Sequence, residues 1–210
     1  MGVWRTARGN DTGVEIHPVT PDRWDDLVEL FERKGPRGGT PIPGSCWCSC
    51  WRERQGVRAL NKAAFKAAVD DGRVPGMIAY AEGRPVGWVA VAVAPREDHS
   101  GLERSRWYGP CPGDRGVFAV TCFYVDRALR GMGVSSALLD AAIEYARASG
   151  ATAVDAFPKV DVAQHALTDR RAEENASWMG RRQSFEARGF VTIRATGKRA
   201  VMRLSFHPEP

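Results

Sequence analysis

The sequence predicts a single α/β domain whose core is a mixed β-sheet of about six or seven strands flanked by helices. Strand-like apolar stretches alternate with segments of helical periodicity, and a length of 210 residues suits one domain. The 43% hydrophobic content is that of a folded globular protein. No apolar run reaches the roughly 18 residues of a membrane-spanning helix, which excludes an integral membrane protein. We expect an N-terminal extension over 1–12, the domain over 13–206 and a short tail over 207–210.

The N-terminal part of the domain has the pattern of one strand and two helices. Residues 13–19 alternate apolar and polar side chains, as a half-buried strand does. Thr20, Pro21 and Asp22 then supply a capping hydroxyl, a first-turn proline and an acid, which predicts the start of a helix. Its apolar face would consist of Trp24, Leu27, Val28 and Phe31. A second amphipathic helix is expected over 60–69, beyond a glycine- and proline-rich loop.

The middle of the chain predicts a hairpin, a long loop and a buried strand. Residues 77–80 and 86–93 are rich in strand-forming side chains and flank a tight turn, as the two arms of a hairpin do. Residues 94–116 are polar and contain three prolines, which predicts a long loop of the kind that often serves function. The continuous apolar run over 117–125 is typical of a strand buried on both faces.

The C-terminal half of the chain alternates helices and strands. Apolar residues recur at helical spacing over 134–146, until Ser149 and Gly150 stop the helix. Beyond it we expect a strand over 151–157, a helix over 177–188 capped by Gly189, and a closing hairpin over 190–193 and 199–206. The resulting order, β-α-α-β-β-β-α-β-α-β-β, is that of an α/β domain with a mixed sheet.

The charge and cysteine content exclude several classes of protein. Thirty Lys and Arg against 25 Asp and Glu give a net charge of +5. These basic residues are spread along the chain, so no nucleic-acid partner is expected. Five cysteines, three of them within residues 46–50, do not resemble the disulfide framework of a secreted protein. With no charged-then-apolar leader at its start, the chain is expected in the cytoplasm and without a membrane partner.

A glycine-containing loop follows the buried strand and opens the long helix. Residues 130–135 read Arg-Gly-Met-Gly-Val-Ser. Glycines let the backbone approach a ligand closely, the helix start offers free amides and a positive dipole end, and Arg130 adds a forked donor. The pattern therefore predicts a phosphate site. It lacks the Gly-Lys-Ser/Thr of a Walker loop, and residues 126–130, which separate strand from glycines, disfavour a Rossmann fingerprint.

Residues 122–139 closely resemble the acetyl-CoA signature of the GNAT superfamily of N-acetyltransferases. The family motif, Arg/Gln-x-x-Gly-x-Gly/Ala, is matched by Arg130, Gly133 and Ser135, the last as a small substitute. Residues 185–190, Phe-Glu-Ala-Arg-Gly-Phe, resemble the family's Tyr-Glu-Lys-x-Gly-Phe near the last helix. The order of elements also resembles the family over most of the chain. The Cys-x-Cys segment looks like that of a bacterial subgroup.

The resemblance implies that acetyl-CoA is bound as the acetyl donor and that the acetyl group passes directly to a primary amine, on a small molecule or a lysine. The backbone of Phe123, Tyr124 and Val125 would hold the pantetheine arm and the acetyl group. The pyrophosphate would be held by Arg130, Gly131, Met132, Gly133, Val134, Ser135 and Ser136. Dimers formed through sheet edges are common among relatives of this fold, so a second copy of the chain is an expected partner.

Acetyl transfer needs a base for the amine, donors for the oxyanion and an acid for the departing thiolate. The candidate bases, all on the long loop before the buried strand, are Glu97, Asp98, Glu103 and Asp114. In the family a tyrosine commonly protonates the thiolate, but that place holds Phe185, which has no proton to give. The substitute would be Tyr124, Cys122, Ser184 or a water. The departure also leaves open a non-catalytic acyl-CoA-binding or sensing protein.

Aromatic and thiol side chains gather in the segment after the glycine- and proline-rich loop. Trp47 and Trp51 are expected either to line the acceptor pocket or to pack in a satellite core. Three thiolates, with a fourth ligand elsewhere, suit zinc, although the Cys-x-Cys-x-Cys spacing is not that of a Cys-x-x-Cys knuckle. The residues concerned are Cys46, Cys48 and Cys50, with Cys111, His99 or His165 as the fourth ligand. Small thiols packed near a pocket are the alternative, and we expect no metal.

Overall fold

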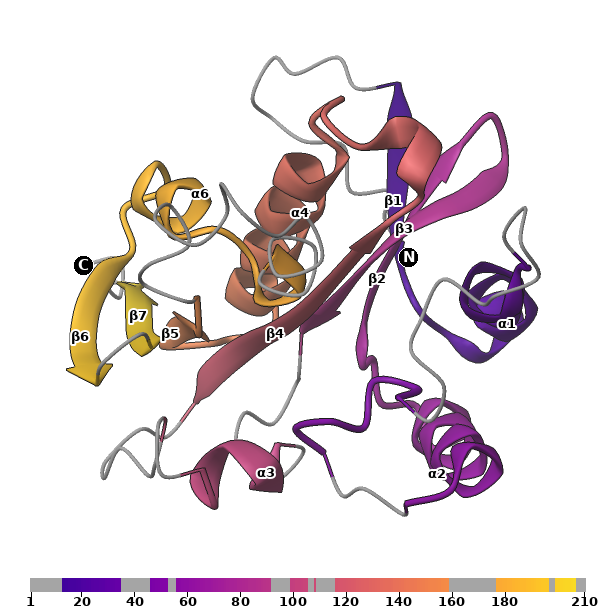
Figure 1. The fold of residues 1–210 in the computed structure, drawn as a ribbon, viewed down its shortest axis with the longest axis horizontal. Coiled ribbons are helices and arrows are strands. Elements are labelled where there is room, and N and C mark those ends of the chain that lie inside the picture. Colours follow the sequence, from indigo (N-terminus) through magenta and orange to yellow (C-terminus); the bar gives the residue numbers. More distant parts are fainter. Residues whose placement is uncertain are drawn as a thin grey trace, which may run out of the picture.

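The computed structural model describes residues 13–34, 46–52, 56–91, 99–105, 108, 116–158, 177–196 and 199–206. Within them a seven-stranded sheet runs through the centre of the molecule in the order β1-β2-β3-β4-β5-β7-β6 (Figure 1). The strands are β1 (Val14–Pro18), β2 (Gly76–Ala81), β3 (Arg84–Val91), β4 (Val117–Val125), β5 (Ala153–Ala156), β6 (Val191–Thr196) and β7 (Arg199–Ser205). The prediction of a mixed sheet flanked by helices is confirmed.

The helices also follow the predicted order. They are α1 (Trp24–Glu32), α2 (Arg58–Asp70), α3 (Ser100–Glu103), α4 (Val134–Ala148) and α6 (Arg182–Glu186), with 3-10 turns at Pro21–Arg23, Arg127–Leu129 and Ser177–Met179. The short α3 lies inside the segment expected to be a loop. None of the helices in the described ranges is both long and apolar enough to cross a membrane.

Two local predictions were wrong. The helix expected over 177–188 is instead a 3-10 turn and the short α6, separated at Gly180, whose φ is +86°. A Cβ at Gly180 would lie 2.6 Å from the ring tip of Phe185, so close packing keeps the chain there in a glycine conformation. Thr20 stands at the start of the first helical segment, but its hydroxyl accepts from the guanidinium of Arg23 at 3.1 Å and makes no side-chain cap.

The strand β4 changes partner partway along its length. All neighbouring strands are antiparallel except β4 and β5, which are parallel and are joined through α4. Their pairing runs from Val117 opposite Ala153 to Val120 opposite Ala156 and stops there. Pro158, just beyond β5, has no N–H with which to extend a ladder. Residues 121–125 therefore continue past the end of β5 while they remain paired to β3 (Figure 1).

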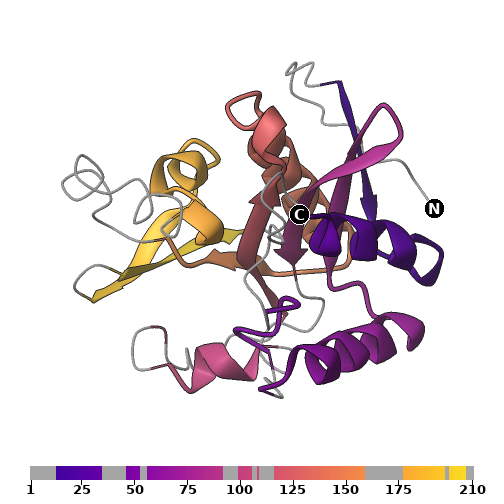
Figure 2. The ribbon, with the colours of Figure 1, turned by 45° about the vertical axis from the view of Figure 1, so that its right-hand side comes forward.

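Two apolar layers cover the two faces of the sheet. Val89 and Val91 of β3 belong to the core cluster that contains the buried face of α4. Trp88 and Ala90 belong to a second cluster, formed with α1 and α2. Since successive side chains of a strand point to opposite faces, α4 lies on one face and α1 and α2 lie on the other (Figure 2).

Leu138, at the centre of the α4 face and fully buried, is expected to carry a large share of the packing. Leu138→Ala should lower the free energy of unfolding by about 2–5 kcal/mol, because a cavity remains where the side chain was. Urea unfolding followed by circular dichroism measures this. Leu60→Ala on α2, where the side chain is 53% exposed, should change the free energy by less than about 0.5 kcal/mol. Equal losses in both variants would contradict the assignment of the core.

Candidate active site

The glycine loop between β4 and α4 has an open surface. Gly131 and Gly133 have φ of +84° and +83°, in the left-handed region that favours glycine. A Cβ placed on Gly131 would meet no atom within 4 Å, so the backbone there can be approached from outside. Before the glycines, the Asp126 carboxylate accepts a hydrogen bond from the Ala128 amide at 3.1 Å and holds the 3-10 turn.

Arg130 joins this loop to the end of β4. Its Nε donates to the carbonyl of Val125 at 3.2 Å, and its side chain is exposed. Met132, between the two glycines, is 58% exposed although it is apolar. The loop therefore presents one cation and one apolar side chain beside the glycine backbone.

The N-terminus of α4 provides an anion site in principle. Gly133 is its N-cap, and the first-turn amides of Val134, Ser135 and Ser136 have no carbonyl of the preceding turn to bind. In a helix that runs from Val134 to Ala148 these amides add to the positive end of the dipole. Phosphate groups bind well at such an end.

Arg188 fastens the end of α6 to the same turn of α4. Its guanidinium pairs with both carboxylate oxygens of Asp140 at 2.5 and 2.9 Å. It also donates to the hydroxyl of Ser136 at 2.6 Å and to the carbonyl of Ser184 at 2.8 Å. Arg188 also donates to the Ser136 carbonyl at 3.0 Å, so of the polar groups of Ser136 the backbone N–H is the one that Arg188 does not bind. These contacts hold the family-like 185–190 segment against the first turns of α4.

The side chains of β4 beyond the end of β5 alternate between the two faces of the sheet. Phe123 and Val125 pack against the α4 cluster, whereas Cys122 and Tyr124 pack against the α1 and α2 cluster. The backbone edge that faced β5 earlier in the strand has no strand partner here among the residues that the structure describes. The predicted Phe123, Tyr124 and Val125 group shares the backbone along this edge, although its side chains point to different faces.

Phe185, at the position of the expected tyrosine acid, is a core residue. Its side chain is fully buried, with ring centroids 6.3 Å from Phe123 and 5.2 Å from Phe190. The ring tip abuts Gly180, where a Cβ would lie 2.6 Å away. A hydroxyl on that tip would be placed out of contact with solvent. The phenylalanine that stands in place of the family's tyrosine therefore fits the aromatic packing around it.

Tyr124 is the nearest phenol on β4 itself. Its side chain is half-buried, and this burial, followed by the negative charge of Asp126, raises the pKa of Tyr124. The phenol is thus protonated at neutral pH and able to donate. The Asp126 carboxylate is held in turn by the guanidinium of Arg33, the residue that follows α1, at 2.9 Å.

The predicted base Glu103 lies on α3 with an exposed side chain. Its helix reaches β4 through His99, whose Nε2 lies 3.2 Å from the hydroxyl of Thr121. Both His99 and Thr121 are buried. Sequence reasoning considered His99 only as a metal ligand and overlooked this contact, because nothing local in the sequence joins the loop to the strand. Glu97, Asp98 and Asp114 lie outside the described residues.

The two predicted pocket tryptophans have different surroundings. Trp47 is 2% exposed and packs between Trp24 and Phe31, with ring centroids 5.7 and 5.3 Å away. Of the two places expected for Trp47, the ring occupies a core, the one formed with α1 and α2. Trp51 lines a small cavity beside β4 and stacks on Trp178 at 6.3 Å.

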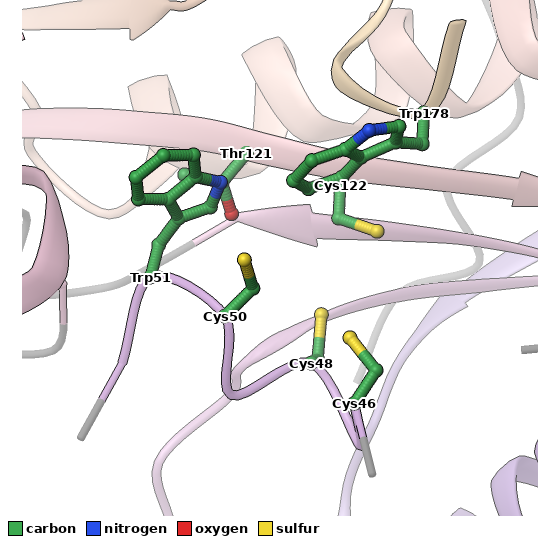
Figure 3. A pocket seen from close by; sticks show the side chains of 7 residues that line it. All are labelled: Cys46, Cys48, Cys50, Trp51, Thr121, Cys122 and Trp178. Atoms are coloured by element: carbon green, nitrogen blue, oxygen red, sulfur yellow. The ribbon is translucent and has the colours of Figure 1, made fainter. Parts of the chain in front are cut away.

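That cavity is surrounded by thiols (Figure 3). It is lined by Cys46, Cys48, Cys50, Trp51, Thr121, Cys122 and Trp178. Among the described side chains, no group of three or more His, Cys, Asp or Glu residues has an arrangement that would hold a metal ion. The zinc alternatives Cys111 and His165 lie outside the described residues. The meeting of Cys122 with the other three thiols had no signal in the sequence.

Comparison with known proteins identifies the class. The family model described as Acetyltransferase (GNAT) family matches residues 24–171, which is more than half of the chain. The chain belongs to this family of acetyltransferases, whose members use acetyl-CoA. The glycine loop at the start of α4 and the free edge of β4 both lie inside the matched region. No match is found among curated protein sequences.

Several solved structures share the fold. The GNAT domain of S. lividans PAT has a TM-score of 0.53 at 18% identity and covers 92% of this chain and 90% of its own. An N-acetyltransferase from Staphylococcus aureus Mu50 has a TM-score of 0.52 at 12% identity, with 91% and 98% covered. The yncA protein of Salmonella typhimurium, solved with acetyl-CoA, has a TM-score of 0.51 at 14% identity, with 94% and 96% covered. At these identities the likeness concerns the fold.

Restoring the family's tyrosine should not restore an acid here. Phe185→Tyr is expected to lower the free energy of unfolding by about 1–3 kcal/mol, because the added hydroxyl is buried among aromatic side chains. It should not increase the rate of thiol release. Urea unfolding and a thiol-release assay measure the two effects. A faster enzyme of unchanged stability would show that the ring tip has access to the reacting groups.

Proposed function

We propose that this protein transfers the acetyl group of acetyl-CoA to a primary amine, on a small molecule or on a lysine side chain. The observation that carries the proposal is the free edge of β4 beside the glycine loop, which leaves an extended backbone and a helix N-terminus next to each other. A long ligand with an anionic middle and a peptide-like arm suits this pair of features.

The residues present fit acetyl-CoA. The amides around Gly133, Val134 and Ser135, with the guanidinium of Arg130, would take the pyrophosphate. The open surface at Gly131 gives the phosphates room to reach them. The backbone over 123–125 would pair with the amide groups of the pantetheine arm in the manner of an added strand. When bound, acetyl-CoA supplies a thioester carbonyl open to attack by an amine.

The reaction needs two proton transfers: the amine loses a proton before it attacks, and the thiolate gains one as it leaves. A primary amine has a pKa near 10, so it must lose a proton before it attacks. Glu103, or a water, remains the candidate to accept that proton. Amides at the end of β4 would bind the oxyanion as it forms. For the departing thiolate we assign the proton of the Tyr124 hydroxyl, because Phe185 has none and the raised pKa of Tyr124 keeps that phenol protonated.

A charge placed at the pyrophosphate position should abolish binding of the coenzyme. In a thermal unfolding scan, acetyl-CoA at 100 times its dissociation constant adds about 2.7 kcal/mol. That should raise the midpoint of the natural sequence by about 5–10 °C, whereas NAD and ATP should not. Gly133→Asp should remove the rise, because it adds bulk and negative charge where the phosphates would lie.

Gly150→Asp is the matched control for this experiment. Gly150 follows the other end of α4, has φ of +78° and has no atom within 4 Å of a built Cβ. The two positions have similar left-handed φ angles and gain the same charge. Because the helix dipole favours an acid at Gly133 and disfavours one at Gly150, the rise with acetyl-CoA is measured for each variant against its own midpoint without ligand. This variant should keep the full rise with acetyl-CoA. If both variants keep the rise, the coenzyme site is elsewhere.

Removing the Tyr124 hydroxyl should slow turnover without weakening coenzyme binding. Tyr124→Phe is expected to lower kcat by about 100-fold or more, the usual contribution of a general acid. Thiol release with a panel of primary amines measures kcat, and the thermal shift measures binding. Tyr145→Phe is the control, because burial also raises the pKa of this half-buried phenol but it lies on α4. Equal activity in both variants would remove Tyr124 from the mechanism.

The buried Phe185 favours a second candidate function, a non-catalytic protein that binds or senses acyl-CoA. Such a protein needs the glycine loop and the free edge of β4 but no acid. It would give a saturable thermal shift with acetyl-CoA and no thiol release with any amine or lysine-containing substrate. Steady thiol release with one acceptor rules it out.

A further inference from the structure

Four cysteines from two distant segments meet beside β4. Cys46, Cys48 and Cys50 lie on the turn before α2, and Cys122 lies on β4. Figure 3 shows their side chains directed into the space between the turn and the strand. The cavity that they line measures about 10 Å³, which is close to the space that one water molecule needs. Cys50, one of the lining residues, is exposed to solvent.

The turn that carries these cysteines has an uncommon backbone. Trp47 and Cys48 have φ of +36° and +53°, in the left-handed region that residues other than glycine rarely adopt. The amide and hydroxyl of Ser49 both donate to the Cys46 carbonyl, at 2.7 and 2.5 Å, and close the turn. Such backbone strain persists where the surroundings enforce it, and here it holds the Cys48 sulfur toward β4.

Two hydrogen-bonding groups and one cation surround the Cys48 sulfur. The indole N–H of Trp88 donates to it at 3.3 Å, and the Cys122 thiol forms a hydrogen bond with it. The Arg52 guanidinium stands nearby, held by the carbonyls of Cys48 and Pro75 at 2.9 and 3.0 Å. A thiolate is stabilised by hydrogen-bond donors and by a neighbouring cation, and Cys48 has both.

The thiols differ in acidity as this geometry requires. The hydrogen bond from Cys122, with the charge of Arg52 and the Trp88 N–H, lowers the pKa of Cys48 to about 6. The same hydrogen bond raises the pKa of Cys122, since its proton is shared with the Cys48 sulfur. Burial raises the pKa of Cys46 to about 11. The Trp88 N–H and the Arg52 guanidinium beside Cys48 therefore favour Cys48 over Cys122 as the thiolate.

We propose that Cys48 and Cys122 form a peroxide-reactive pair, in which Cys48 is the attacking thiolate and Cys122 is the resolving thiol. This inference goes beyond the proposed acetyl transfer and does not depend on it. Reactive thiols are found where a lowered pKa, a partner thiol and access by a small oxidant coincide.

The chemistry balances with hydrogen peroxide as the oxidant. The Cys48 sulfur bonds to one peroxide oxygen, the O–O bond breaks, and hydroxide leaves. Cys48 is then a sulfenic acid, and its sulfur has been oxidised while the peroxide has been reduced. Cys122 loses its proton, its sulfur attacks that of Cys48, and the hydroxyl group leaves as water. The products are one disulfide, one water and one hydroxide from one peroxide molecule, one thiolate and one thiol.

The size of the cavity selects the oxidant. A space that suits one water molecule admits hydrogen peroxide, which is only slightly larger, but excludes a tripeptide disulfide or an aryl hydroperoxide. We therefore expect hydrogen peroxide to oxidise the pair much faster than glutathione disulfide or cumene hydroperoxide does.

The test is mass spectrometry of the full chain after reduction and treatment with one equivalent of hydrogen peroxide. The expected result is the loss of two hydrogen atoms, with peptide mapping that links Cys48 to Cys122. Cys122→Ser should stop at the sulfenic acid, which gains one oxygen atom and is trapped by dimedone. Cys48→Ser should lose this reaction.

Cys50→Ser is the matched control. It removes an exposed thiol from the same turn while both members of the pair remain, so it should react as the natural sequence does. Preferential oxidation of Cys46 or Cys50 would overturn the proposal. So would a Cys122→Ser protein that still forms an internal disulfide at Cys48, or a purified protein whose thiols hold a metal ion and resist peroxide.

The rate of oxidation should depend on pH with a sign that the geometry predicts. A lowered pKa means that the thiolate is present above about pH 6 and is lost below it, so the rate should fall as the pH drops through this value. The ionisable groups that face Cys48 are Cys46, Cys50, Cys122 and Arg52. Arg52→Gln should move the midpoint upward. A midpoint near that of an ordinary thiol in the natural sequence would overturn the assignment of Cys48 as the attacking thiolate.

Discussion

The limited pairing between β4 and β5 is the constraint on which the rest of the site depends. The two strands are parallel over Val117–Val120 and then separate, so among the described residues the remainder of β4 has β3 as its one strand neighbour. A parallel pair requires a crossover, and the helix that supplies it, α4, must begin near the end of β4. The glycine loop and the free backbone edge are therefore neighbours as a consequence of the topology.

The C-terminal segment packs against the part of β4 that continues beyond β5. The left-handed Gly180 separates the turn Ser177–Met179 from α6 and lets the Phe185 ring pack against Phe123. The Arg188 guanidinium then ties the end of α6 to the first turns of α4. Phe185, which stands where the family resemblance implies a tyrosine, is part of this buried packing. A catalytic proton would then come from a phenol on the strand itself.

The alternation of side chains along β4 separates two kinds of chemistry. Phe123 and Val125 face α4, whereas Cys122 and Tyr124 face α1 and α2. The thiol cluster thus lies on the α1 and α2 face, while the elements proposed to bind the coenzyme are the edge of the strand and the start of α4. One strand can bind a ligand through its backbone and also carry a reactive thiol as a side chain. The backbone hydrogen-bonding groups lie in the plane of the sheet, whereas the side chains point out of it.

The sequence by itself determined the order of the elements, the mixed sheet and the glycine loop before the long helix. These depend on local periodicity, β-propensity and the conformational freedom of glycine, all of which operate within a few residues. Only the tertiary structure decided that Trp47 is core while Trp51 lines a cavity, and that Cys122 meets Cys48. It also decided that the Phe185 ring tip is enclosed. Burial and close approach arise from contacts between segments far apart in the chain, and no local pattern encodes them.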